Sequence, residues 1–97
     1  MEKQMNLRQS ILDALVDDSE SIVQIKNYLK YYNVSHTDVL LKEIIIGLLD
    51  ESIIKIIYPP NSDAMDIVKA DSHTITDYWF KLTEKGYEEW NNITLKD

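Results

Sequence analysis

The stretch Tyr78-Trp79-Phe80-Lys81-Leu82-Thr83-Glu84-Lys85-Gly86 carries the clearest signal in the chain, because a strand pattern gives way there to a helix start. Its first half alternates between two faces with the period of two that is typical of a half-buried strand. We therefore predict a strand over residues 77–83, which would place Tyr78, Phe80 and Leu82 on one face and Trp79 and Lys81 on the other.

The helix that follows is expected to begin directly after Thr83. A threonine hydroxyl at a helix start can accept a hydrogen bond from a free backbone N–H of the first turn. We predict a last helix from Glu84 to Ile93. Gly86, in its first turn, has two explanations: its small size allows close packing of the helix, or it relieves strain in that turn.

Two helices are expected near the N-terminus, because apolar residues recur there at helical spacing. The first helix runs from about Met5 to Asp17. The second is capped by Ser19 or Asp18 and ends near Asn33. Their apolar faces hold Leu7, Ile11, Ala14 and Leu15 in the first helix, and Ile22, Ile25, Leu29 and Tyr32 in the second.

A third helix is predicted from Ser35 to Asp50. Ser35 is a capping residue, and the acid three positions later makes a weaker form of the capping box. Val39 and Ile46 fall outside the main apolar face, so the helix is either deeply buried or has a second partner. The main apolar face holds Leu40, Leu41, Ile44, Ile45 and Leu48.

An earlier strand is predicted over residues 52–58, where β-branched and aromatic residues run up to a proline pair. Alternation would place Ile54, Ile56 and Tyr58 on one face and Ile53, Lys55 and Ile57 on the other. The polar stretch from Asn61 to Asp77 is either a long loop or a loop with a short element around Ala64–Ala70.

A single domain over residues 1–97 is expected from the length of the chain. The chain is 44% hydrophobic and 28% charged, which excludes an intrinsically disordered or collagen-like protein. It contains no cysteine, which excludes a disulfide framework and any Cys-ligated metal site. No apolar run approaches the ~18 residues that span a bilayer. We therefore expect a cytoplasmic protein without a membrane partner.

No arrangement of residues typical of an enzyme is present. His36 and His73 are far apart in sequence and have no partner at metal-ligand spacing. The chain has two glycines, so it lacks a Gly-rich phosphate loop, and no Ser-His-Asp arrangement stands in a recognisable context. We expect a protein that is not an enzyme, with no catalytic residues, no metal and no cofactor.

The charge balance argues against a protein that grips nucleic acid without regard to sequence. The formal net charge is -7, and Arg8 is the one arginine of the chain. Nucleic-acid binders usually carry a basic stripe and a high pI, whereas the pI here is about 4.7. The simplest explanation is that the acidity keeps a small protein soluble.

The order helix, helix, helix, strand, long loop, strand, helix resembles that of a winged helix. The run Val39–Ile54 is similar to the third helix of that fold and its path into the first wing strand. The motif Leu82-Thr83-Glu84-Lys85-Gly86 resembles the Leu-Thr-x-x-Gly signature found in bacterial regulators of the MarR and PadR kinds. The resemblance implies an α+β winged helix with a three-helix core, a two-stranded wing hairpin and a C-terminal helix.

The resemblance also implies a DNA-binding transcriptional regulator that acts as a homodimer on duplex DNA. The third helix of such proteins enters the major groove, and the wing contacts the backbone or minor groove. The corresponding positions include Asp38 and Glu43, which would repel phosphate, and a wing with one cation against four aspartates. The side chains suited to contact DNA are His36, Thr37, Lys42 and Lys69.

The alternative is an acidic protein–protein interaction module that uses the third helix and the wing and binds no DNA. Exposed apolar clusters mark interfaces, and aromatic residues are favoured anchors. Internal packing is the other explanation for these residues, with the long wing segment folded back over them. The candidate interface residues are Val39, Ile46, Trp79 and Trp90.

Overall fold

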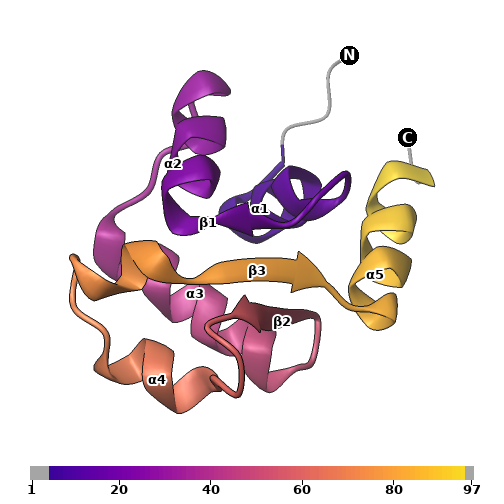
Figure 1. Cartoon of the computed structure of the whole chain (residues 1–97). Coiled ribbons are helices and arrows are strands. Elements are labelled where there is room, and N and C mark those ends of the chain that lie inside the picture. Colours follow the sequence, from indigo (N-terminus) through magenta and orange to yellow (C-terminus); the bar gives the residue numbers. More distant parts are fainter. Residues whose placement is uncertain (1–4, 96–97) are drawn as a thin grey trace.

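The central element of the computed structural model is β3 (Trp79–Leu82), the middle strand of a three-stranded antiparallel sheet in the order β1-β3-β2 (Figure 1). The structure describes the backbone of residues 5–95 and the side chains of residues 5–93. Over that range five α-helices and one 3-10 helix accompany the sheet, so the predicted α+β class is confirmed. Residues 1–4, 96 and 97 of the predicted domain lie outside the described residues.

β3 shows the predicted alternation between a buried and an exposed face. Phe80 and Leu82 are buried and Lys81 is exposed. β2 (Ile54–Tyr58) pairs with β3 and is shorter than predicted, because Ser52 and Ile53 belong to the turn that follows the third helix. The prediction that Ile53 and Ile54 lie on opposite faces of a strand was wrong at this turn, because both side chains are buried, each 2% exposed.

β1 (Glu20–Ser21) corrects two predictions. It pairs with β3, so the sheet has three strands instead of the two of the predicted hairpin. α2 (Ile22–Tyr31) therefore begins after Ser21, and the predicted cap at Ser19 or Asp18 is wrong. Ser21 forms a capping box with the glutamine three positions on. Strand pairing with a distant segment sets this helix boundary, and local sequence does not reveal such pairing.

The apolar faces of the first two helices are largely as predicted. α1 (Leu7–Leu15) buries Leu12 in addition to the predicted leucines and Ile11, whereas Ala14 is half-buried. Tyr32, predicted on the buried face of α2, is 59% exposed. It lies at the C-cap, beyond the helix, and Asn33 follows with a φ of 56° that turns the chain away.

α3 (Asp38–Asp50) begins later than predicted. Thr37, not Ser35, caps it, because the Thr37 hydroxyl accepts a hydrogen bond from the N–H of Leu40 at 3.1 Å. The predicted pairing of Ser35 with Asp38 is therefore wrong, and Asp38 forms an ion pair with Lys26 of α2 instead. Leu41, Ile45 and Leu48 are buried as predicted and Ile44 is half-buried, but Leu40 is 42% exposed.

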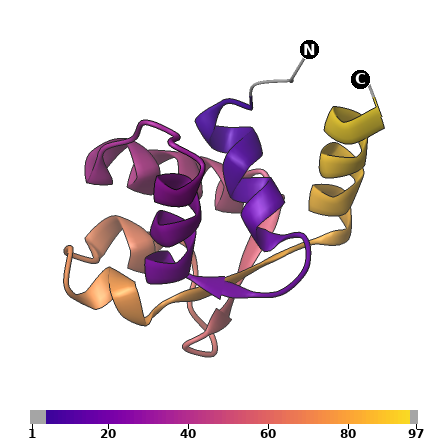
Figure 2. The same cartoon turned by 90° about the horizontal axis from the view of Figure 1, so that it is seen from above.

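The segment between β2 and β3, residues 59–78, is called the β2–β3 connection below. It contains α4 (Ala64–Lys69), as one of the two alternatives predicted, and the 3-10 helix η1 (Thr74–Asp77). Ile67, Ala70 and Ile75 are the buried apolar residues that tie it to the core. In Figures 1 and 2 the connection lies on the opposite side of the molecule from the last helix.

α5 (Glu84–Leu95) starts directly after Thr83 as predicted, since the Thr83 hydroxyl accepts a hydrogen bond from the N–H of Gly86 at 3.1 Å, and it ends two residues later than predicted. Gly86 is required for close packing, because a Cβ there would lie 2.2 Å from the backbone oxygen of Ile53. Its φ is not positive, so backbone conformation alone does not require glycine. Among the described residues no helix is long and apolar enough to cross a membrane.

Arg8 joins three elements through one guanidinium group. Its Nε and Nη2 donate to the carboxylate of Glu89 in α5 at 2.9 and 2.8 Å, and its Nη1 donates to Glu51 after α3 at 2.9 Å. Hydrogen bonding to Arg8 is the largest cause that holds the pKa of Glu51 below its usual 4.5.

This contact predicts an acid-dependent loss of stability. A carboxylate with a lowered folded-state pKa stabilises the fold above its unfolded pKa, and the stabilisation is lost as the pH falls through the folded-state value. We expect Arg8→Met to lower the free energy of unfolding at neutral pH and to flatten its fall below pH 4.5. Urea unfolding of both proteins at about pH 7, 4.5 and 3 measures this.

Lys30→Met is the matched control, because it removes one positive charge from an exposed helix position. Glu20 acts with the opposite sign, since desolvation and the nearby Asp18 raise its pKa, but it is present in every variant. Equal acid slopes for the wild type and Arg8→Met would contradict the role assigned to Arg8.

Candidate functional site

The β2–β3 connection lies against α3, on the side that holds Lys42, one of the residues predicted to contact DNA. α4 packs against α3, and η1 packs against α2. Lys42, on the outward side of α3, donates a hydrogen bond from Nζ to the backbone oxygen of Ala70 in the connection. Part of the outward surface of α3 is therefore covered by the chain itself.

The four residues predicted to contact DNA do not form one basic surface. Thr37 caps α3 with its hydroxyl, and Lys42 is bonded to the connection. His36 Nδ1 lies 2.9 Å from the backbone oxygen of Val34, and since that oxygen accepts, the nitrogen donates. Lys69 is exposed at the end of α4. Three of the four side chains thus serve contacts within the chain.

The four candidate interface residues are also dispersed. Val39 is 69% exposed at the start of α3, whereas Ile46 is half-buried against the core. Trp79 is half-buried on the outer face of β3. Trp90, on α5, packs partly against the core and donates from Nε1 to Asp13 Oδ1 at 3.0 Å. Val39 is the one of the four that is mainly exposed.

A pocket of about 220 Å³ lies where α2, α3 and the β2–β3 connection meet. It is called the α2–α3 pocket below. Its apolar floor consists of Ile22, Leu41 and Ile75, which are 3%, 3% and 9% exposed. Val39 and Ala70 complete the apolar lining, and the polar lining residues are Lys26, Asp38, Lys42, Asp71 and Ser72.

The charges that line the α2–α3 pocket cancel. Lys26 Nζ lies 2.7 Å from Asp38 Oδ1, and this contact lowers the pKa of Asp38. Backbone N–H groups of Thr74 and His73 lower the pKa of Asp71. Both carboxylates are therefore ionised at neutral pH and balance the two lysines of the lining.

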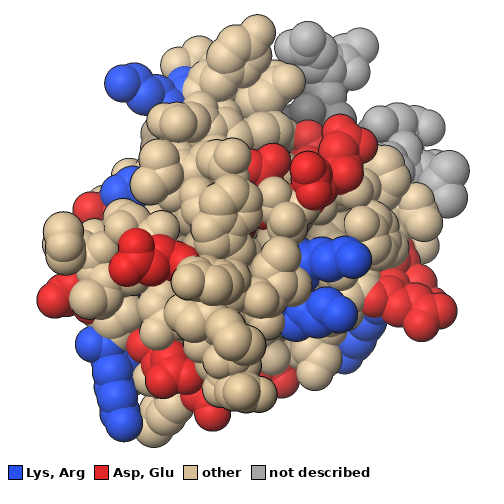
Figure 3. Space-filling model, viewed as in Figure 1, with Lys and Arg blue, Asp and Glu red and all other residues tan. Residues whose placement is uncertain are grey.

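Acidic residues dominate α3 and the connection taken together. Residues 38–50 and 59–78 contain seven carboxylates and two lysines, Lys42 and Lys69. Figure 3 shows acidic and basic residues scattered over a largely uncharged face, without a continuous basic stripe. A surface of this kind repels phosphate and attracts positively charged groups.

One local concentration of positive charge was not singled out by the sequence. Lys55 of β2 lies directly opposite Lys81 of β3, and both are exposed. Like charges directly opposite each other in a sheet are destabilising. The pairing register, which brings residues far apart in sequence together, creates this feature.

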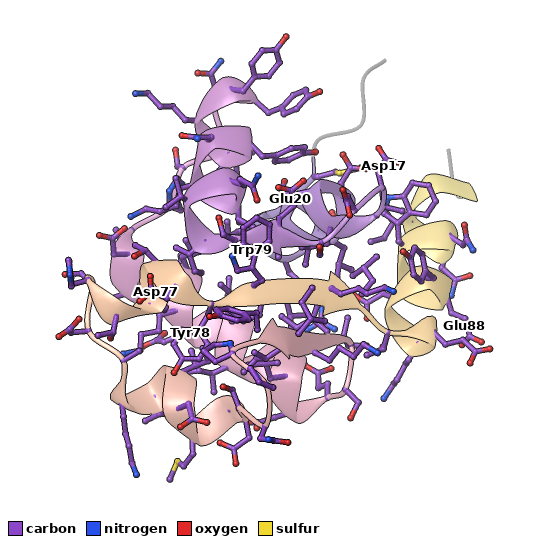
Figure 4. All side chains as sticks on the ribbon, in the orientation of Figure 1. Asp17, Glu20, Asp77, Tyr78, Trp79 and Glu88 are labelled. Atoms are coloured by element: carbon purple, nitrogen blue, oxygen red, sulfur yellow. The ribbon has the colours of Figure 1, made fainter. Side chains whose placement is uncertain are left out.

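The carboxylates labelled in Figure 4 lie apart from one another. Figure 4 shows Asp77 and Glu88 near opposite ends of β3, with Asp17 and Glu20 above the strand. No group of three or more His, Cys, Asp or Glu side chains able to hold a metal ion occurs among the described residues. The described residues therefore offer surfaces and a pocket on which a function can be argued.

Several residues of the α2–α3 pocket were missed by sequence reasoning, namely Lys26, Ala70, Asp71, Ser72 and Ile75. A local signal exists for the start of α4, the helix that precedes four of these residues. Asp63 and Asp66 form a capping box at the start of α4, and this spacing is visible in the sequence. The packing of the connection against α2 and α3 has no local signal.

Comparisons of the chain with protein-family models, curated protein sequences and solved structures gave no match. The functional conclusion is therefore drawn from the fold, the pocket and the surface charges described above.

Proposed function

We propose that the chain is a variant winged-helix domain that acts as a protein-interaction module and does not bind DNA. The succession of three helices, a strand, a long connection, a strand and a helix supports the winged-helix assignment. The observation that carries the interaction function is the β2–β3 connection packed against α3 and bonded to Lys42.

Dimensions favour this proposal over DNA binding. The major groove is ~12 Å wide and admits one α-helix. A helix with its side chains is already ~10–12 Å across. α3 carries α4 against its side, so the two helices together exceed the width of the groove. Lys42 would also have to leave the backbone oxygen of Ala70 before it could reach a phosphate.

The surface chemistry favours a positively charged partner protein with apolar contact residues. Val39, which lines the α2–α3 pocket, is 69% exposed, and its chain neighbour Leu40 is 42% exposed. Exposed apolar groups in a polar surround are typical of interfaces. The seven carboxylates of α3 and the connection would attract a basic surface and speed the encounter.

A DNA titration tests the proposal directly. We expect no rise in fluorescence anisotropy when a random-sequence duplex is titrated with the protein at about 50 and 200 mM salt. Non-specific DNA binders reach a Kd of ~10⁻⁴–10⁻⁶ M at physiological salt and bind more tightly at low salt. Salt-sensitive binding at micromolar protein concentrations would contradict the proposal, and loss of that binding in Lys42→Ala would assign it to α3.

The partner arm of the test uses two valines. Val39→Asp is expected to weaken partner capture by about tenfold or more, which corresponds to ~1.4 kcal/mol or more. The matched control is Val23→Asp, since Val23 is 48% exposed on α2 and does not line the α2–α3 pocket. Cross-linking from cells with quantitative mass spectrometry measures both variants, and circular dichroism checks the fold. An equal effect of the two substitutions would contradict the assigned surface.

The homodimer implied by the resemblance stays a prediction. Light scattering of the wild type measures it, and Val39→Asp would leave the mass unchanged if the dimer uses another surface.

A further inference from the structure

We propose that the α2–α3 pocket binds a small, uncharged, largely apolar molecule, and that this ligand holds the β2–β3 connection against α2 and α3. The proposal goes beyond the interaction function and stands independently of it. Its basis is the size of the pocket, the chemistry of its lining and the origin of its walls.

The size of the pocket suits one compact molecule. An apolar cavity of ~150 Å³ in another protein accommodates benzene, with six non-hydrogen atoms. The α2–α3 pocket measures about 220 Å³. By simple proportion it accommodates about nine non-hydrogen atoms, the size of an indole or a small substituted benzene.

The lining selects an apolar body with one polar group. Ile22, Leu41 and Ile75 supply an apolar floor that is at most 9% exposed. Ligand sites typically combine such a floor with a few polar groups that set orientation. Lys42 Nζ can donate three hydrogen bonds and uses one for the backbone oxygen of Ala70. A hydroxyl or carbonyl oxygen of the ligand can therefore accept from the same ammonium group.

The charges select an uncharged ligand. Lys26 and Lys42 are balanced by Asp38 and Asp71, and Lys26 is already paired with Asp38. A charged ligand would lose hydration against a lining that carries no net opposite charge, which is costly. Neutral molecules are therefore expected to bind better than acids or amines of the same shape.

Because the pocket lies between the β2–β3 connection and the helices α2 and α3, a bound ligand stabilises the contact between them. The pocket is closed on one side by residues 70–75 of the connection and on the other by α2 and α3. A ligand that binds the closed arrangement and not the open one stabilises it by a factor of 1 + [L]/Kd. At a ligand concentration of ten times Kd, opening of the connection becomes about elevenfold rarer.

The test is an amide-resolved NMR titration of the full chain with indole and benzyl alcohol, with benzoate and benzylamine as charged counterparts. We expect saturable shifts of pocket residues with the two neutral probes, with a Kd of ~1 mM as typical of so small a ligand. Hydrogen exchange of the Ala70, Ile75 and Tyr78 amides, which are bonded within the connection, should slow about tenfold at ten times Kd.

Two leucine variants provide the matched comparison. Ser72 is exposed and lines the pocket, so Ser72→Leu should fill it and weaken probe binding at least tenfold. Thr76 is exposed on η1 and does not line the pocket, so Thr76→Leu should leave binding unchanged.

Three results would overturn the proposal. The first is the absence of saturable shifts, and the second is equal binding by wild type and Ser72→Leu. The third is a concentration-dependent shift of the same amides without any probe, which would assign the pocket to a second copy of the chain.

Discussion

Gly86→Ala is expected to destabilise the fold by about 3 kcal/mol or more, the upper part of the range for overpacking. The new Cβ would lie 2.2 Å from the backbone oxygen of Ile53 and 3.1 Å from Leu82 Cδ2. The Ile53 oxygen cannot retreat freely, because it accepts a hydrogen bond from the N–H of Thr83 at 3.0 Å. Relief therefore requires α5 to move away from the turn before β2.

Thermal and urea unfolding followed by circular dichroism measure this effect. For a domain of this size each 1 kcal/mol shifts the unfolding midpoint by ~4–8 °C, so a decrease of at least ~12 °C is expected. A loss of about 3 kcal/mol is a large fraction of the free energy of unfolding, which is typically ~5–15 kcal/mol for a small domain.

Gly47→Ala is the matched control within the same chain. Gly47 lies in the interior of α3, and nothing stands within 4 Å of the position its Cβ would take. Alanine is favoured over glycine in a helix interior by ~0.5–1 kcal/mol, so this variant should be slightly more stable than the wild type. A small effect of Gly86→Ala, or a large loss for Gly47→Ala, would contradict the packing described for α5 and α3.

Ile67→Ala is expected to release the β2–β3 connection from α3. α4 has six residues, too few for a stable isolated helix, so it depends on packing. Ile67 is 0% exposed and is the one buried residue of α4. Truncation of a buried isoleucine to alanine costs ~2–5 kcal/mol, which is enough to unfold the connection locally.

Hydrogen exchange resolved by residue measures this release. Protection should fall for the amides of Ala70 and Tyr78, whereas the amides of the α1 and α2 core should change little. Val68→Ala is the control, since Val68 is 47% exposed on the same helix and its truncation should stay within ~0.5 kcal/mol of the wild type. A uniform loss of protection over the whole chain would show that the connection is part of the global folding unit.

The Ile67→Ala variant also bears on the proposed function. Once the connection leaves α3, the helix is uncovered and Lys42 is free of its bond to Ala70. A gain of salt-sensitive DNA binding in this variant, absent from the wild type, would show that the connection is what keeps α3 from the groove. The absence of a gain would assign the lack of DNA binding to the acidic surface itself.

The parts of the fold predicted correctly depend on residues close together in sequence. The alternation from Tyr78 to Leu82 and the helix start at Thr83 were confirmed, because a strand face and an N-cap are set by spacing over a few residues. The buried faces of α1 and α3 were largely confirmed for the same reason. The α+β class followed from the order of these elements.

The errors arose where a distant segment or a neighbouring residue competes with the local signal that the prediction used. Ser19 and Ser35 are good capping residues, but strand pairing of Glu20 and Ser21 and the cap at Thr37 moved both helix starts. Tyr32 has helical spacing to the apolar face of α2, but the helix ends before it. A propensity is a weak preference, and a few tertiary contacts outweigh it.

The functional surface, too, was predicted only as far as composition and local spacing reach. Composition alone revealed the acidity that argues against phosphate binding, and helical periodicity revealed that Val39 lies off the buried face of α3. The cover over α3, the α2–α3 pocket and the Lys55–Lys81 pair come from contacts between different elements, such as Lys42 with Ala70 and Lys55 with Lys81. Such contacts depend on which apolar faces pack against each other in the tertiary structure. The spacing of residues along the chain shows that a face is apolar, but not which other face it packs against.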